Sequence, residues 1–149
     1  MTVKSPTIFA TTTVVVRKPV ETVWRLFNDR SRWMDSFKSL EVVEGAIGET
    51  GAVARVAMTA DGPGVQRLEE TLHAERFRRQ VIRLTTGGPV AHADFQFEPT
   101  PEGCRVTVSI HGFMPQGLDY DVDMLQEQTQ AKISHDFENL RVVAETDSQ

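Results

Sequence analysis

The stretch VVVRKPVETVWRLFNDRSRW, residues 14–33, changes its hydrophobic period in the middle. The valines end a β-branched run over residues 7–17, which is typical of a strand. Pro19 suits the first turn of a helix, where its missing N–H is no loss. The apolar spacing then becomes helical, at Val20, Val23, Trp24 and Phe27. The stretch therefore predicts a strand that leads directly into a short helix, and residues 31–37 predict a second short helix.

The chain beyond residue 38 has the regularly spaced turn signals of an antiparallel meander. Turn signals recur at residues 48–51, 61–64, 87–89 and 99–103. The runs between them have roughly the spacing of eight to twelve residues that strands of such a sheet show. The clearest strand is residues 91–98, where Ala91, Ala93, Phe95 and Phe97 alternate with polar residues.

Residues 65–77 are ambiguous, because they combine helix formers with an apolar spacing that fits a helix only in part. We predict a strand, since the neighbouring segments are strands and tertiary context overrides propensity. At period two, Leu68 and Leu72 share a face with Glu70, and we assign this face to the interior.

A long amphipathic helix is predicted over residues 118–145. A helix is about 10–12 Å across, whereas seven strands about 4.8 Å apart form a sheet about 30 Å wide. One helix cannot cover such a sheet while it is flat. We therefore expect the sheet to curl round the helix, with space between the two.

Composition limits the classes of partner. The 149 residues fit one domain, 1–149, with a net charge of −5. Residues 1–114 carry a net charge of +1 and residues 115–149 a net charge of −6, which argues against a nucleic-acid partner. Cys104 is the only cysteine, and no apolar run has the length of a membrane span or the form of a signal peptide. We expect a cytoplasmic monomer or homodimer.

The order of strand, two short helices, six strands and long helix resembles the START-like, Bet v 1-like (SRPBCC) superfamily, and in particular its bacterial polyketide cyclase/dehydrase and lipid-transport proteins. Lys18 stands where relatives commonly have a small residue. The residues that carry the resemblance are Pro19, Val23, Trp24, Phe27, Asp29 and Trp33, with the Gly45–Gly51 turn and the 118–145 helix. The resemblance implies an α+β helix-grip fold, with a curved antiparallel sheet of six to seven strands around the C-terminal helix.

The resemblance also implies an internal cavity that binds a small hydrophobic molecule, of a polyketide-like or other aromatic class. The expected lining is Met58, Leu68, Leu72, Phe95, Phe97, Met114, Leu125 and Thr129, with Trp33, Met34, Phe37 and Tyr120 near the mouth. For Trp33, Met34 and Phe37, core packing is an equal alternative to ligand contact. For Tyr120 the alternative is exposure to solvent.

Two other functions remain open at this point: a cofactor-free cyclase, aromatase or lyase, and an interaction protein of the co-chaperone kind. Glu70 is the candidate catalytic residue, since a buried carboxyl has a raised pKa and can transfer protons. Alternatively, Glu70 lies at the sheet edge or pairs with Arg67 or Arg83. The His and Cys residues are scattered without the spacing of metal ligands, so we expect neither a metal nor a cofactor.

Overall fold

The computed structural model describes residues 7–86, 90–113 and 121–146. Strands and helices follow one another in the predicted order. They are β1 (Thr7–Val16), α1 (Val20–Phe27), η1 (Arg30–Arg32), β2 (Phe37–Glu44), β3 (Val53–Met58), η2 (Thr59–Asp61), β4 (Arg67–Glu75), β5 (Arg79–Thr85), β6 (Val90–Thr100), β7 (Gly103–Phe113) and α2 (Val122–Thr146). Here η1 and η2 are single 3₁₀ turns.

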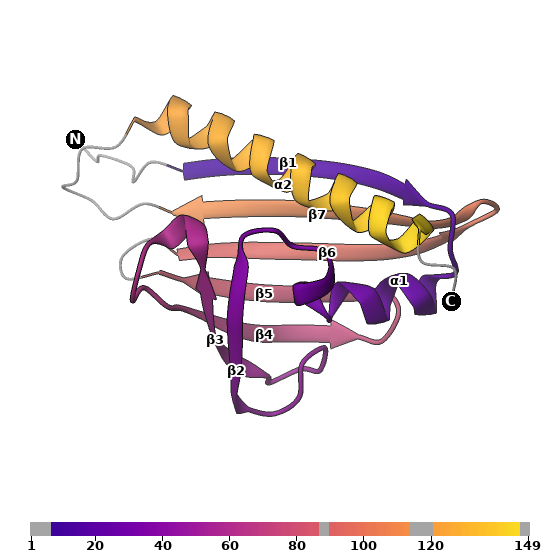
Figure 1. Ribbon diagram of the computed structural model, residues 1–149, viewed down its shortest axis with the longest axis horizontal. Helices are drawn as coiled ribbons and strands as arrows, with labels where there is room; N and C mark the ends of the chain where they lie inside the picture. The colour runs from indigo at the N-terminus through magenta and orange to yellow at the C-terminus, as the bar shows by residue number, and fades with distance from the viewer. Residues whose placement is uncertain (1–6, 87–89, 114–120, 147–149) are drawn as a thin grey trace, which may run out of the picture.

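The strands form one seven-stranded antiparallel sheet in the order β1-β7-β6-β5-β4-β3-β2. In Figure 1 the sheet is curved, because β2 and β3 turn across the direction of the other strands. Helix α2 runs over β1 and β7, and α1 lies near the C-terminal end of α2 (Figure 1). The helix-grip prediction is confirmed, and so is a strand within residues 65–77, which is β4.

The predicted helices are partly shorter in the structure. The segment 31–37 forms only the η1 turn, and Phe37 already begins β2. Within the described residues α2 begins at Val122, and the first residues predicted for it, 118–120, lie outside that part of the chain.

Helix α2 is attached to one edge of the sheet through side-chain amides. Strand β1 is an edge strand, so half of its backbone groups have no partner strand. The amide of Gln126 accepts from the backbone N–H of Phe9 at 2.8 Å and donates to its carbonyl oxygen. The amide of Gln130 likewise accepts from the backbone N–H of Thr11 at 3.2 Å and donates to the Thr11 carbonyl oxygen at 2.8 Å. These contacts hold α2 at the β1 edge, at the opposite end of the sheet from β2 to β4.

The core fills the end of the sheet that α1 closes. Trp24 is buried in α1, with its ring centroid 5.0 Å from that of Phe97 on β6. Phe27 lies 5.3 Å from the Phe97 ring, and Leu140 of α2 is fully buried in the same cluster. Trp24 is therefore a core residue.

One glycine position is required by the path of the chain between β1 and α1. The turn between β6 and β7 packs directly on this connection, and Gly103 has a φ of 152°. A Cβ atom at Gly103 would lie 2.2 Å from the carbonyl oxygen of Val16 and 2.7 Å from the nitrogen of Lys18. Only glycine fits there, since both neighbours are backbone atoms.

The inner face of β4 is the opposite of the predicted one. Glu69 and Thr71 are buried, with 5% and 8% of their surface exposed. Leu68 and Leu72 are 36% and 43% exposed on the outer face. The prediction followed the apolar residues of the strand, but the side chains that face inward here are polar.

Candidate functional site

A cavity of about 420 Å³ lies between α2, the inner face of the sheet and the segment that contains η1. Its size falls within the usual range of small-molecule sites, about 300–1,000 Å³. Its lining comes from both sequence halves, because the curled sheet brings β4 and β5 opposite α2. The anchoring of α2 at the β1 edge explains why the helix leaves this space beside it.

Four aromatic side chains, Phe27, Trp33, Phe95 and Phe137, form one wall of the cavity. The rings of Phe95 and Phe137 are stacked with centroids 6.0 Å apart, and those of Phe27 and Trp33 are stacked at 5.9 Å. The indole Nε1 of Trp33 donates to the carbonyl oxygen of Phe27 at 3.3 Å, so this ring is fixed. Rings held in this way present a rigid apolar surface to an aromatic guest.

The remaining apolar lining is aliphatic and comes mainly from the sheet. It consists of Ile8, Ile82, Leu84, Val90, Ala91, Ala93, Ile110 and Gly112, with Met34, Met58, Leu125 and Ile133. The small residues of β6 leave the volume empty that larger side chains would fill. The two methionines are flexible and adapt to the shape of a guest.

The most buried polar group of the cavity is the ion pair of Arg30 and Glu69. Arg30 Nη1 donates to Glu69 Oε2 at 2.8 Å, and Nη2 donates to Oε1, so the pair is bidentate. Burial by itself would lower the pKa of the Arg30 guanidinium, but the charge and hydrogen bonds of Glu69 outweigh it and raise that pKa. Each side chain of this pair depends on the other for its place in the interior.

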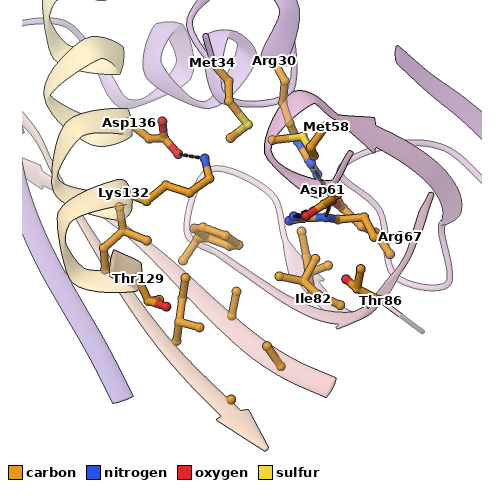
Figure 2. Close-up of a pocket in the computed structure, with 18 of the residues that line it drawn as sticks. Arg30, Met34, Met58, Asp61, Arg67, Ile82, Thr86, Thr129, Lys132 and Asp136 are labelled. Atoms are coloured by element: carbon orange, nitrogen blue, oxygen red, sulfur yellow. Dashed lines mark hydrogen bonds and ion pairs between the residues drawn. The ribbon is translucent and has the colours of Figure 1, made fainter. Parts of the chain in front are cut away.

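Two further ion pairs enter the cavity from different walls (Figure 2). Arg67 of β4 contacts Asp61 of η2, with Nη2 2.9 Å from Oδ2 and Nε 3.2 Å from the same atom. Lys132 of α2 donates to Asp136 Oδ2 at 2.8 Å, one helical turn further on. The cavity thus combines a mostly apolar lining with three salt bridges, Arg30–Glu69, Arg67–Asp61 and Lys132–Asp136.

Six of the sequence-predicted site residues lie in the cavity wall. They are Trp33, Met34, Met58, Phe95, Leu125 and Thr129. They come from four parts of the fold, namely the η1–β2 segment, the end of β3, β6 and α2. The structure therefore places these six residues around one cavity.

The other predicted lining residues lie elsewhere. Phe37 packs against the small cluster of Ala54, Val56 and Met58. Phe97 is buried in the core cluster and does not line the cavity, and Leu68 and Leu72 point outward from β4. The last two positions, Met114 and Tyr120, lie outside the described residues.

The prediction that Glu70 points into the interior is wrong. Its carboxylate lies on the outer face of β4, where Arg83 Nη2 donates to both oxygens at 2.9 Å. This is the salt bridge with Arg83 that the sequence left open as an alternative, and both side chains are partly exposed. The carboxyl that lines the cavity is its neighbour, Glu69.

The charged lining residues were not predicted as part of the site. Two of them had a signal, since Lys132 and Asp136 lie at helical spacing from Thr129 and Ile133, on the face of α2 that turns inward. The sequence prediction took Leu125 and Thr129 from that face and left out the two charged residues. Arg30 belongs to a 3₁₀ turn, whose direction is set by the fold and has no period in the sequence.

Metal binding finds no support in the described part of the chain, where His, Cys, Asp and Glu nowhere gather in groups of three or more that could hold an ion. The lining instead offers apolar surface, aromatic rings and paired charges. These groups suit an organic molecule.

A family described as polyketide cyclase/dehydrase and lipid transport matches residues 7–145. The chain belongs to this family. The match runs from the start of β1 into the last turn of α2, so the residues that line the cavity and form its three salt bridges all lie within it. No curated protein matches the sequence significantly.

Solved structures share the START-like, Bet v 1-like fold over nearly the whole chain. A START superfamily protein from Mycobacterium smegmatis is 13% identical, with a TM-score of 0.75, and the match covers 93% of this chain and 97% of that one. The protein TTHA0849 from Thermus thermophilus is 20% identical, with a TM-score of 0.74 and coverages of 97% and 100%. DynU16, a protein of the dynemicin biosynthetic locus, is 24% identical, with a TM-score of 0.65 and coverages of 93% and 47%.

At these identities the similarity to the solved structures is a similarity of fold. Among the described residues of this protein, no helix is both long enough and apolar enough to cross a membrane.

Proposed function

We propose that this protein binds a small, mostly apolar molecule in the cavity beneath α2. The observation that carries the proposal is the cavity itself, about 420 Å³ of space lined by aromatic and aliphatic side chains. Most protein interiors are packed to crystal-like density, with few voids larger than a water molecule. A void of this size lined by apolar groups is stabilised when a guest with apolar surface fills it.

Two further observations support a guest with an aromatic body. The wall of Phe27, Trp33, Phe95 and Phe137 offers flat rings in stacked pairs. The family is described by polyketide and lipid chemistry, and DynU16 belongs to a biosynthetic locus. An aromatic metabolite fits the ring wall better than a long saturated chain does.

Calorimetric titration with 2-acetylnaphthalene tests the proposal. We expect saturable binding of one molecule per chain in the micromolar range. Ala91 of β6 lines the cavity, so Ala91→Trp should fill it and abolish binding. Gln96 points outward from the same strand, so Gln96→Trp is the matched control and should bind as the wild type does. Absence of binding by a panel of aromatic and aliphatic compounds would refute the proposal.

A second candidate, a cofactor-free cyclase or lyase, is favoured by one specific observation. Charged N–H donors of Lys132 and Arg67 lie inside a mostly apolar cavity, where fixed donors stabilise the developing negative charge of an enolate better than water does. If the protein is such an enzyme, a poly-β-ketone should be converted to cyclised product, and Lys132→Met should slow that conversion by about 10² or more. A bound compound that is recovered unchanged after long incubation favours the binding protein.

A further inference from the structure

The charged side chains among the described residues of the cavity lining have a net charge of zero. Its three cationic side chains, Arg30, Arg67 and Lys132, each form a salt bridge with a carboxylate that also lines the cavity. The partners Glu69 and Asp136 are largely buried, with side chains 5% and 9% exposed. The positive groups are therefore already neutralised before any guest enters.

Lys132 and Arg67 nevertheless have N–H groups that make no hydrogen bond to a described residue. Lys132 Nζ has three N–H groups, of which one is directed to Asp136 Oδ2 and another to Ser36 Oγ at 3.0 Å. Arg67 uses Nε and Nη2 for Asp61, and no described residue accepts from its Nη1. Arg30 is held by its bidentate pair with Glu69 and is the most buried of the three cations, with 13% of its side chain exposed.

The unused N–H donors favour a ligand with a hydrogen-bond acceptor, and the zero net charge of the lining favours a ligand without charge. A carbonyl or phenolic oxygen satisfies a spare N–H without disturbing the salt bridges. A carboxylate would lose its hydration and meet carboxylates already placed beside each cation, which gives a net negative charge in a mostly apolar space. A hydrocarbon would cover the spare donors and leave them without any acceptor.

We propose that the ligand is a neutral molecule with an aromatic body and a carbonyl or phenolic oxygen, and that this oxygen accepts a hydrogen bond from Lys132, Arg67 or both. The inference rests on the proposed function and narrows it: free fatty acids and other carboxylates are the wrong class. Lys132 and Arg67 are then the residues that determine specificity, while the ring wall supplies most of the affinity.

Three probes of one shape test this. They are 2-acetylnaphthalene, a neutral ketone, 2-naphthoate, an anion at pH 7, and 2-isopropylnaphthalene, which has no acceptor. We expect the ketone to bind about tenfold more tightly than either of the others, the effect of one or two satisfied hydrogen bonds. Affinities are measured by competition against one fluorescent neutral probe at constant ionic strength.

Two variants test whether the Lys132–Asp136 salt bridge causes these differences in affinity. Lys132→Met should lower the affinity for the ketone several-fold and leave that for the hydrocarbon unchanged. Lys38→Met, on the exposed edge strand β2, is the control and should change neither. Asp136→Asn leaves Lys132 without its carboxylate, so it should raise the affinity for 2-naphthoate about tenfold while that for the ketone hardly changes.

The outcomes separate the inference from the function on which it rests. Equal binding of all three probes, or tighter binding of 2-naphthoate by the wild type, would overturn the inference and leave the cavity a binding site. Binding of none of them would overturn both. If Lys132→Met does not fold, Asp136→Asn still decides, because unchanged 2-naphthoate affinity in that variant contradicts the role of charge balance.

Discussion

Strands β4 and β6 face the same cavity from the same sheet, yet their inner faces differ in kind. Strand β6 presents Ala91, Ala93 and Phe95, as its alternation predicts. Strand β4 presents Arg67 and Glu69 and turns its leucines outward. The difference shows that apolar alternation locates the inner face only where the interior is apolar. Where paired charges line a cavity, the polar residues are the inward ones.

The largest expected effect is on the apolar strand. Phe97→Ala removes a buried ring that packs on Trp24 and Phe27, so it should lower the free energy of unfolding by about 3–5 kcal/mol. Gln96→Ala, the adjacent outward residue, should change it by less than about 0.5 kcal/mol. Denaturant unfolding measures both, and a loss below about 1 kcal/mol for Phe97→Ala would show that this end of the sheet is not a packed core.

The second expected effect distinguishes two adjacent carboxylates of β4. Glu69→Gln leaves the buried Arg30 guanidinium without its anion and should lower the unfolding free energy by about 3 kcal/mol. Glu70→Gln breaks only the partly exposed contact with Arg83, so it should cost less than about 1 kcal/mol. The same unfolding measurement compares them, and equal losses would contradict the assignment of the inner face.

A double replacement sharpens this comparison. Arg30→Met with Glu69→Leu removes both charges, and apolar residues of similar volume commonly replace a buried ion pair without loss of stability. We expect the unfolding free energy of the double variant to lie within about 1 kcal/mol of the wild type. A double variant as unstable as Glu69→Gln alone would show that unpaired charge is not the cause of that variant's instability.

A smaller effect is expected on the outer face of β4. Leu72 is 43% exposed, so Leu72→Ser should change the unfolding free energy by about 0.5 kcal/mol or less. Ile82 of β5 is buried against the cavity and serves as the contrast, since Ile82→Ala should cost about 2 kcal/mol or more. Thermal unfolding monitored by circular dichroism ranks the two, and a reversed order would place the leucine inside.

The last expected effect concerns pH. Burial raises the pKa of the Cys104 thiol on β7 from about 9.0 to about 11. The folded state therefore holds this proton more tightly, and its contribution to stability is complete below pH 9 and is lost as the pH rises towards 11. The unfolding free energy of the wild type should therefore fall over this range more than that of Cys104→Ala. Parallel pH profiles would show that the thiol is not buried.

The fold was predictable because it depends on periods that survive in the sequence. The switch at Pro19, the alternation of β6 and the stripe of α2 each fix one element and its buried face. The ambiguity of residues 65–77 was resolved correctly as β4 from its neighbours alone. The extent of the second short helix was not predictable, because one 3₁₀ turn has too few residues to show a period.

The site was predictable where it is apolar and was missed where it is charged. Trp33, Met34 and Phe95 were found because large apolar side chains near a cavity are expected there. Arg30 and Glu69 were missed because a charged residue is stable inside only through its partner, and the partner is 39 residues away in the chain. Pairing over such a distance is a property of the fold and leaves no local pattern.

The measurement that tests the central claim most directly is a methyl NMR titration with 2-acetylnaphthalene. Ring currents of the probe shift the signals of methyl groups that touch it. We predict large shifts for Ile82, Ile110 and Met58, which line the cavity, and none for Leu68 and Leu72 on the outer face of β4. Shifts at Leu68 and Leu72 without shifts at Ile82 and Met58 would contradict both the inner face and the binding site assigned here.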